Sequence, residues 1–501
     1  MFSKVNLKNA RFLDCICLIA LSILVVLSSI SGVYNNNLEY SLDHGLAFEG
    51  GYRILKGQIP YRDFYIPTGP VVYYIQALFN YIFGMNLIAI GMHTAIMAVI
   101  LCSYFFCILR RDFNRLISFV LTYVLFFSFC GVIYYPFHNL AAFFFLLLNF
   151  LILIDREIIN LKIVFLSIIL CALSFFSKQD TGLLQSVFVG SYILLFSKNR
   201  FKHCFCFLLG LLVIVFSTMF FFNNTGNFFT HFNFCGPPFP SRINWFFTAS
   251  GIQWILTNSQ FYLIVLSVFL WRNKKYQSNK EFIFLLFGIN FITLIVSVTS
   301  SVCEQTILES IPLSLYLIFT IFKDDIKNLS DISQFKTWFV CLLSVIYLLP
   351  IARAFFHLAK ISVNSYAYSR ISCGSYKGLA LPSVYLLDLY KIQSILNKQK
   401  DFLNITTNHQ FFYQDHNIDP PKPMPLWFDY RVSFFDKEVF RLVECIKEKR
   451  PKIILIDEEL CVTIRELSLD SFMELGYKEI FSTELSGATG GDLIRVLELK
   501  N

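Results

Sequence analysis

The sequence predicts a polytopic all-α membrane bundle of about eleven transmembrane helices, followed by a small α/β domain outside the membrane. The composition is the first reason: 56% of the 501 residues are hydrophobic and only 15% are charged, which excludes an ordinary soluble protein. The second reason is that apolar stretches of roughly the 17–25 residues that cross a bilayer recur over most of the chain. The third is a change near residue 360, beyond which the chain is more charged. We therefore place the membrane domain at 1–358 and the α/β domain at 359–501.

The first apolar run is too long for a signal-peptide core of about 7–15 residues, so we expect a signal anchor that stays in the membrane. The run 69–84 is short and follows Pro67 and Pro70, which favours a helix lying at the membrane surface. The eleven expected spans lie at about 12–33, 86–108, 114–132, 138–154, 161–177, 182–197, 203–222, 254–271, 281–300, 306–322 and 337–357.

The distribution of Lys and Arg predicts the orientation, because cytoplasmic loops carry an excess of both. Eighteen of these residues fall in one set of alternate loops and five in the other. The N-terminus is therefore expected in the cytoplasm. The first loop (35–85) and, with an odd number of spans, the α/β domain are expected on the outer side of the cytoplasmic membrane. The five outer residues are Arg53, Lys56, Arg62, Lys178 and Arg242.

The C-terminal part alternates two kinds of pattern, as expected of an α/β domain. Its helix-like runs are 437–449, which ends just before Pro451, and 464–475. Its strand-like runs are 401–407, 452–457, 479–483 and 492–498.

The first outer loop gathers charges of both signs between hydrophobic helices. Such groups are unfavourable beside hydrocarbon, so the cluster is a functional-site hypothesis. Glu39 and Glu49 are expected to lie on the solvated face of a surface helix. We find no nucleic-acid-binding motif. The charged residues of the cluster are Glu39, Asp43, Glu49, Arg53, Lys56, Arg62 and Asp63.

Four segments carry a resemblance to a known family. An acid just after the first span, Asp43, is followed by Gly51–Gly57 (GYRILKG) and Pro60–Phe64 (PYRDF). A Pro-rich turn and an aromatic stretch follow at Pro67–Leu78. A second similar segment is Ser177–Gly182 (SKQDTG). In these features and in its architecture the chain resembles the GT-C glycosyltransferases, in the aminoarabinose transferase and protein mannosyltransferase branch. The resemblance implies a polyprenyl-phosphate sugar donor and a lipid- or glycan-linked acceptor.

Two departures from the family pattern leave the sugar and any divalent metal open. The family has an acidic residue just before the Pro-rich turn, where this chain has Pro67-Thr-Gly-Pro. In the second outer loop the family has another Asp, whereas this chain has Tyr134–Asn139 (YYPFHN).

The resemblance assigns Asp43 as the general base that takes the proton of the acceptor hydroxyl during an inverting attack. The alternative is a merely solvated acid beside a membrane span. Asp63 is the second catalytic candidate, which would bind a metal, hold a sugar hydroxyl or orient Arg62. A local salt bridge to Arg62 is the alternative.

The leaving phosphate needs cations, because negative charge grows on it in the transition state. Arg62 and Lys178 are the first candidates, with Arg53 and Arg242 behind them. Side chains that only extend toward the interface would look the same in sequence.

Four further residues are candidates for the wall of a pocket. Gln179 and Asp180 would otherwise cap the sixth span, and His138 would otherwise cap the fourth. Glu304 lies in a short outer loop. Cys235 and Cys303, in two outer loops, are a candidate disulfide pair.

Two other classes of function compete with a transferase. A transporter or flippase of lipid-linked glycans should show ionisable or glycine-broken spans and an internal repeat, and the sequence shows neither clearly. A receptor or scaffold acting through the α/β domain predicts that the change Asp43→Asn has no effect on function.

Overall fold

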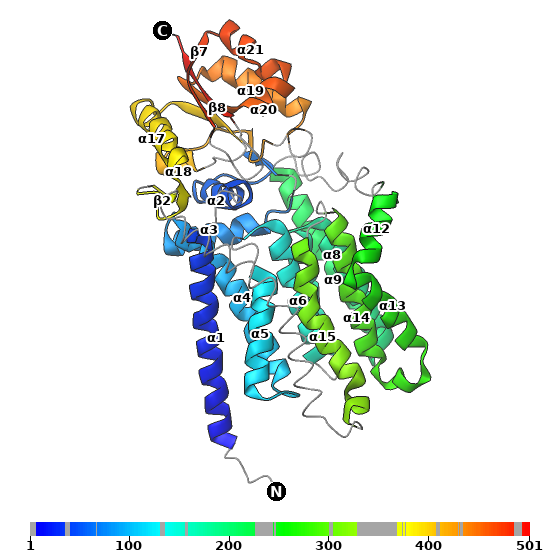
Figure 1. Ribbon diagram of the computed structural model, residues 1–501. Coiled ribbons are helices and arrows are strands. Elements are labelled where there is room, and N and C mark those ends of the chain that lie inside the picture. The colour runs from blue at the N-terminus through cyan, green and yellow to red at the C-terminus, as the bar shows by residue number, and fades with distance from the viewer. Residues whose placement is uncertain are drawn as a thin grey trace.

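The computed structural model shows a helical bundle with a smaller α/β part at one end (Figure 1). The residues that the structure describes are 7–35, 41–66, 68–130, 136–155, 159–225, 244, 247–299, 304–327, 368–372, 374–375, 377–406, 411–428, 430, 434–484 and 493–500.

Helices follow most of the predicted spans. Five described helices are long and apolar enough to cross a membrane, or six when one bent pair counts as a single span, so this is a multi-pass membrane protein. The number eleven remains a prediction, because several other apolar helices are shorter and 337–357 lies outside the described residues. The bundle helices are α1 (Leu7–Asn35), α4 (Leu87–Leu109), α5 (Arg115–Cys130), α6 (His138–Asp155), α7 (Leu161–Phe175), α8 (Gln179–Phe196), α9 (Arg200–Thr225), α12 (Ala249–Thr257), α13 (Ser259–Arg272), α14 (Lys280–Thr299) and α15 (Glu304–Lys327).

The predicted span 254–271 is not one straight helix. It is divided between α12 and α13, which meet at an angle of 69°. Asn258 has extended backbone at the break. The side chains of Thr257 and Asn258 both donate to the carbonyl of Trp254, at 2.9 and 3.0 Å. Polar side chains that bind nearby carbonyls compete with the helical ladder, and hydropathy does not register this effect.

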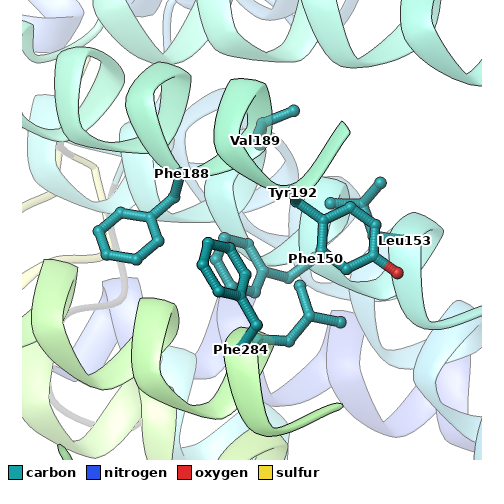
Figure 2. Close-up of a pocket in the computed structure, with 7 residues that line it drawn as sticks. Phe150, Leu153, Phe188, Val189, Tyr192 and Phe284 are labelled. Atoms are coloured by element: carbon teal, nitrogen blue, oxygen red, sulfur yellow. The ribbon is translucent and has the colours of Figure 1, made fainter. Parts of the chain in front are cut away.

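Aromatic and aliphatic side chains fill the bundle between α6, α8 and α14. Figure 2 shows the side chains of Phe150, Phe188, Tyr192 and Phe284 gathered from these helices around a narrow gap. The ring centroids of Phe188 and Phe284 are 5.8 Å apart. The lining of this narrow gap has almost no polar group. The gap is therefore suited to packing inside a membrane bundle rather than to chemistry.

Buried amide and hydroxyl groups connect the helices at a few points. Ser167 on α7 donates to Asn149 on α6 at 2.9 Å, and Asn290 on α14 donates to Ser314 on α15 at 3.0 Å. Such pairs hold helices together in lipid, where apolar contact alone gives little preference for protein over lipid.

The C-terminal part contains a four-stranded sheet in the order β4-β6-β8-β7, in which β4 and β6 are parallel and the other neighbours antiparallel. All four predicted strand runs are found. The predicted helix 464–475 is divided, because Ser468 has extended backbone and caps a short helix, α21 (Leu469–Glu474). The other elements here are β2 (Tyr368–Arg370), β3 (Ala380–Pro382), α17 (Ser383–Lys398), β4 (Phe402–Ile405), α18 (Phe412–Asp415), β5 (Met424–Pro425), α19 (Asp436–Lys449), β6 (Ile453–Asp457), α20 (Glu458–Thr463), β7 (Tyr477–Glu484) and β8 (Leu493–Leu499).

Two helices of the first loop lie between the bundle and the sheet: α2 (Ser41–Leu55) and α3 (Val71–Phe83) (Figure 1). α3 has 13 residues, too few to cross a bilayer. The first loop and the C-terminal part are therefore at the same end of the bundle.

Candidate functional site

The helices α2 and α3 pack closely because two adjacent glycines face α3. A Cβ on Gly50 would lie 2.3 Å from the ring of Tyr73, and one on Gly51 would lie 2.9 Å from the amide of Asn80. The pair Gly50-Gly51 therefore permits the close approach of α2 to α3, and these two helices form the platform of the site.

The turn between the two helices is held by Tyr61, which is fully buried and has a left-handed backbone (φ 66°). Its hydroxyl donates to the carbonyl of Thr68 at 2.6 Å, and its ring meets the edge of Phe222 at 5.5 Å. A non-glycine residue in this region is unusual, and the surrounding contacts hold it there.

Asp63 and Arg62 form the local ion pair that the sequence left as an alternative. Arg62 donates to both carboxylate oxygens, at 3.1 and 2.6 Å, and the N–H of Ile59 donates to one of them at 2.9 Å. Although burial raises the pKa of Asp63, the hydrogen bonds from Arg62 and Ile59 outweigh it, and the pKa falls below its ordinary value. Asp63 therefore stabilises the turn, and its catalytic role stays a prediction.

The turn also contacts the corner between α7 and α8. A Cβ on Gly69 would lie 1.8 Å from the carbonyl oxygen of Phe176, and Val71 donates its N–H to that same oxygen at 3.2 Å. The predicted Lys178 and Gln179 follow two and three residues after Phe176, and both are mostly buried. Two motifs more than a hundred positions apart in the sequence thus meet at this corner.

Lys178 and Asp180 are close to each other at the start of α8. The Nζ of Lys178 lies 3.5 Å from Oδ2 of Asp180. Oδ1 of Asp180 accepts the N–H of Thr181 at 2.6 Å, but Asp180 lies inside the first turn and Lys178 occupies the N-cap position without a side-chain cap, so neither Gln179 nor Asp180 is the N-cap residue. Lys178 precedes α8 and is the cation nearest in sequence to the contact with the turn.

A small hollow with a volume of about 10 Å³ lies on this platform. His138, the first residue of α6, lines this hollow, with its ring packed against Phe137 at 4.7 Å between ring centroids. The other contributions come from both loop helices and from the C-terminal part. The residues that line the hollow are Leu46, Ala47, Val72, Tyr73, Phe137, His138 and Trp427.

Several predicted residues are described only in part or not at all. Asp43 lies in the first turn of α2, three and four residues before Leu46 and Ala47, and only its backbone is described. Glu304 is the first residue of α15, with its backbone alone described. Arg242 and the candidate pair Cys235 and Cys303 lie outside the described residues.

Two expectations for α2 are corrected. Glu49, expected on a solvated face, is completely buried, and its Oε1 accepts from Nε of Arg53 at 2.8 Å. Arg53, expected to bind phosphate, is 2% exposed and also donates to Gln58 at 3.3 Å and to the carbonyl of Pro421 at 3.2 Å. Arg53 therefore belongs to a buried group of hydrogen-bonded polar side chains inside the protein. The i, i+4 spacing of the pair is a sequence signal that favours an ion pair.

The C-terminal segment, residues 411–428, covers this pair. Gln414 donates to the second oxygen of Glu49, and Gln58 donates to the carbonyl of Pro420 at 2.8 Å. β1 (Phe64–Tyr65) pairs with β5 in parallel register. Burial raises the pKa of Glu49 to about 7, against the lowering effect of Arg53 and Gln414.

Trp427 is the site residue that sequence reasoning missed. It is separated from the first loop by hundreds of positions, and no motif marks it.

No group of ligands for the candidate metal is found: over the described parts of the chain, no three His, Cys, Asp or Glu side chains lie together in a way that could hold an ion.

Comparisons with known proteins return matches only among solved structures, since no family model and no curated protein matches the chain. The chain is similar to ArnT from Cupriavidus metallidurans bound to undecaprenyl phosphate, with 12% identity, a TM-score of 0.46 and coverage of 96% of this chain and 97% of that one. It is also similar to the oligosaccharyltransferase of Archaeoglobus fulgidus. The apo form gives 11% identity, a TM-score of 0.44 and coverage of 95% and 74%. The complex with Zn and sulfate gives 11% identity, a TM-score of 0.43 and coverage of 94% of this chain and 73% of that one. Similarities this loose assign no substrate and no residue role.

Proposed function

We propose that this chain is an integral membrane glycosyltransferase. It transfers a sugar from a polyprenyl-phosphate donor to a lipid- or glycan-linked acceptor on the outer face of the cytoplasmic membrane. The observation that carries the proposal is the hollow at the end of the apolar bundle, formed by α2, α3, the start of α6 and the C-terminal segment, with Asp43 one helical turn away on α2.

The position of the hollow suits a substrate with an isoprenoid anchor. Its floor belongs to α2 and α3, which lie across the end of the bundle, and His138 marks the point where α6 begins. An isoprenoid chain stays in hydrocarbon while its phosphate and sugar emerge at the surface. A site at this depth therefore meets the reactive part of such a donor.

The proposed chemistry needs a base on one side of the sugar and a cation on the other. Asp43 would accept the proton of the acceptor hydroxyl as that oxygen attacks the anomeric carbon. Lys178, at the corner where the turn meets α8, would stabilise the leaving phosphate. Arg62, whose side chain is nearly half exposed beside Asp63, is the second cation of this proposal.

The test is the change Asp43→Asn, which keeps the shape of the side chain and removes its basicity. Loss of a general base is expected to lower the rate of sugar transfer by about 10²–10⁴-fold. The measurement is the transfer of radiolabelled sugar from polyprenyl-phosphate donors by the purified variant after reconstitution into membranes. Expression level and thermal unfolding in detergent should match those of the wild-type protein.

Asp470→Asn is the matched control, because Asp470 is an exposed acid on α21, far along the chain from the hollow. It should keep wild-type transfer. Wild-type turnover by Asp43→Asn would contradict the proposed mechanism. Movement of donor across vesicles without sugar transfer would instead support the flippase alternative.

A further inference from the structure

We propose that the loops joining α8 to α9 and α13 to α14 form one surface that binds the headgroup of an anionic phospholipid. This basic surface lies at the end of the bundle opposite to the first loop, so it is separate from the proposed transferase site. The inference goes beyond the proposed function and does not depend on it. The cations of the basic surface are Lys198, Arg200, Lys202, Arg272 and Lys274.

The length of α9 places the basic surface at the far end of the bundle. Near the end of this helix, the ring of Phe222 lies 5.5 Å from the buried ring of Tyr61 in the first loop. Arg200, at the start of the same helix, lies about 33 Å from Phe222 along the axis, because an α-helix rises about 1.5 Å per residue. That distance matches the hydrocarbon core of a bilayer. The two ends of α9 are therefore expected at opposite membrane surfaces, and the distribution of Lys and Arg predicts that the Arg200 end faces the cytoplasm.

Aromatic contacts bring the two loops together. Phe196, just before the first of them, and Trp271, just before the second, have ring centroids 6.5 Å apart. Both rings also contact Phe284 on α14, at 5.8 and 6.5 Å. The Nζ of Lys280 lies 5.2 Å from the centroid of the Trp271 ring. Tryptophan is enriched at the level of lipid headgroups, so this contact is expected to place both loops at that depth.

The cations of the basic surface have no acidic partner. Within the part of the chain that the structure describes, none of the five forms an ion pair, and all five side chains are exposed. Other cations at the same end of the bundle are paired, since Arg110 and Arg115 both bind Asp14, at 3.1 and 2.6 Å (Figure 1). Glu281, the nearest acid in the sequence, accepts a hydrogen bond from Tyr192 at 3.3 Å. The basic surface therefore presents positive charge that attracts an anion.

Exposed apolar surface continues from both loops along the helices. Phe201 and Phe205 at the start of α9 are 72% and 65% exposed, and Phe269 near the end of α13 is 66% exposed. Only 11% of the apolar stretch of α9 is buried inside the bundle. In a multi-pass membrane protein such surface faces lipid chains. A ligand at this place therefore meets cations and hydrocarbon together. An anionic phospholipid has a part that matches each, whereas a soluble anion or an acidic protein matches only the charge.

Native mass spectrometry of the full-length protein in detergent measures the binding of single lipids. Dioleoylphosphatidylglycerol is the anionic probe, and dioleoylphosphatidylcholine, with the same acyl chains, is the zwitterionic one. We expect the wild-type Kd for phosphatidylglycerol to be at least tenfold lower than that for phosphatidylcholine. Raising ammonium acetate from about 50 mM to about 500 mM should remove most of this preference, because salt screens exposed charges.

The test variant combines Arg200→Gln, Lys202→Gln, Arg272→Gln and Lys274→Gln, and should bind the two lipids with Kd values within twofold of each other. The variant with Arg200→Lys and Arg272→Lys keeps the charge and should keep at least a fivefold preference. The matched control removes the same charge from the C-terminal part and should keep the wild-type preference. It changes four exposed lysines to Gln: Lys398, Lys437, Lys447 and Lys452.

Equal affinity of the wild-type protein for the two lipids at low salt would overturn the inference. So would an unchanged preference in the four-residue test variant, or an equal loss in the matched control, because binding would then follow net charge alone. Undecaprenyl phosphate that binds more tightly than phosphatidylglycerol, and loses this affinity in the test variant, would contradict the choice of a phospholipid.

Thermal unfolding shows whether the four-residue variant folds. If it does not, the variant with only Arg272→Gln and Lys274→Gln decides the question. Its preference for phosphatidylglycerol should be at least threefold below that of the wild type, and an unchanged preference would overturn the inference. Sugar transfer is not a readout of this experiment, so a failure of the proposed function leaves its result unaffected.

Discussion

At the scale of single residues, the site depends on the buried contact of Glu49 with Arg53 and Gln414. A carboxylate removed from water is tolerated only with close partners, and here both of its oxygens are bound. The opposing effects of burial and of the two partners leave the pKa of Glu49 at about 7, above its ordinary value of 4.5. This contact joins the first loop to the C-terminal segment.

The raised pKa predicts how stability depends on pH. The folded protein binds the proton of Glu49 more tightly than the unfolded chain does, so the contribution of Glu49 to stability is greatest below its unfolded pKa. It falls as the pH rises from about 4.5 to about 7, by on the order of 3 kcal/mol for a difference of this size. We expect the thermal midpoint of the wild-type protein in detergent to decrease between pH 5 and pH 8.

The variant Glu49→Gln cannot titrate at this position. Its thermal midpoint should change distinctly less than that of the wild type over the same pH range, whatever its absolute stability. Equal pH dependence in the two proteins would show that the folded-state pKa of Glu49 is not raised.

At the scale of elements, the site depends on the turn that leads into α3 and its approach to the α7–α8 corner. Gly69 makes this possible, since any Cβ there would overlap the backbone of Phe176. A clash with backbone cannot be relieved by a side-chain rotation, so the turn or the corner must move. The same contact holds Lys178 close to the first loop.

We predict that Gly69→Ala destabilises the protein by about 1–3 kcal/mol, or more, because overpacking against fixed backbone has this effect. Sugar transfer should fall as well, since the turn would be displaced from Lys178. Thermal unfolding and the transfer assay measure the two effects.

Gly210→Ala on α9 is the matched control. A Cβ at that position would meet the far end of Ile168, at 2.7 Å, and that flexible group can rotate away. Its effect on stability should be clearly smaller than that of Gly69→Ala. Equal effects in the two variants would mean that the turn does not depend on its contact with Phe176.

At the scale of the whole molecule, the first loop and the C-terminal part form one body at the same end of the bundle (Figure 1). The distribution of Lys and Arg predicts that this end faces outward. Because α3 lies across the bundle end and does not span, the chain should return to the cytoplasm after α4.

Reporter fusions test this orientation. Alkaline phosphatase, which is active only outside the cytoplasm, should be active when fused after Asn501 and inactive when fused after Phe113, beyond α4. Green fluorescent protein should fluoresce at the N-terminus. Phosphatase activity after Phe113 would show that α3 crosses the membrane, and an inactive fusion after Asn501 would place the α/β part in the cytoplasm.

Much of the architecture could be predicted from the sequence, because it depends on local patterns. Runs of apolar residues give the bundle helices, and the strand-like runs of the C-terminal part give β4, β6, β7 and β8. Local sequence patterns also gave, as alternatives to a role in the site, the ion pair of Arg62 with Asp63 and the position of His138 at the start of a helix. The bend at Asn258 was missed, since it depends on side chains that bind a carbonyl rather than on hydropathy.

The sequence by itself therefore determined the class of protein, the course of its helices and the loop in which the chemistry is proposed. Only the tertiary structure decided that Glu49 and Arg53 are internal, that Gly69 lies on Phe176, and that Trp427 borders the hollow. The reason is physical: Glu49 and Gln414 are 365 positions apart, and burial of a charge depends on what packs over it. A local pattern carries no information about a partner that arrives from the far end of the chain.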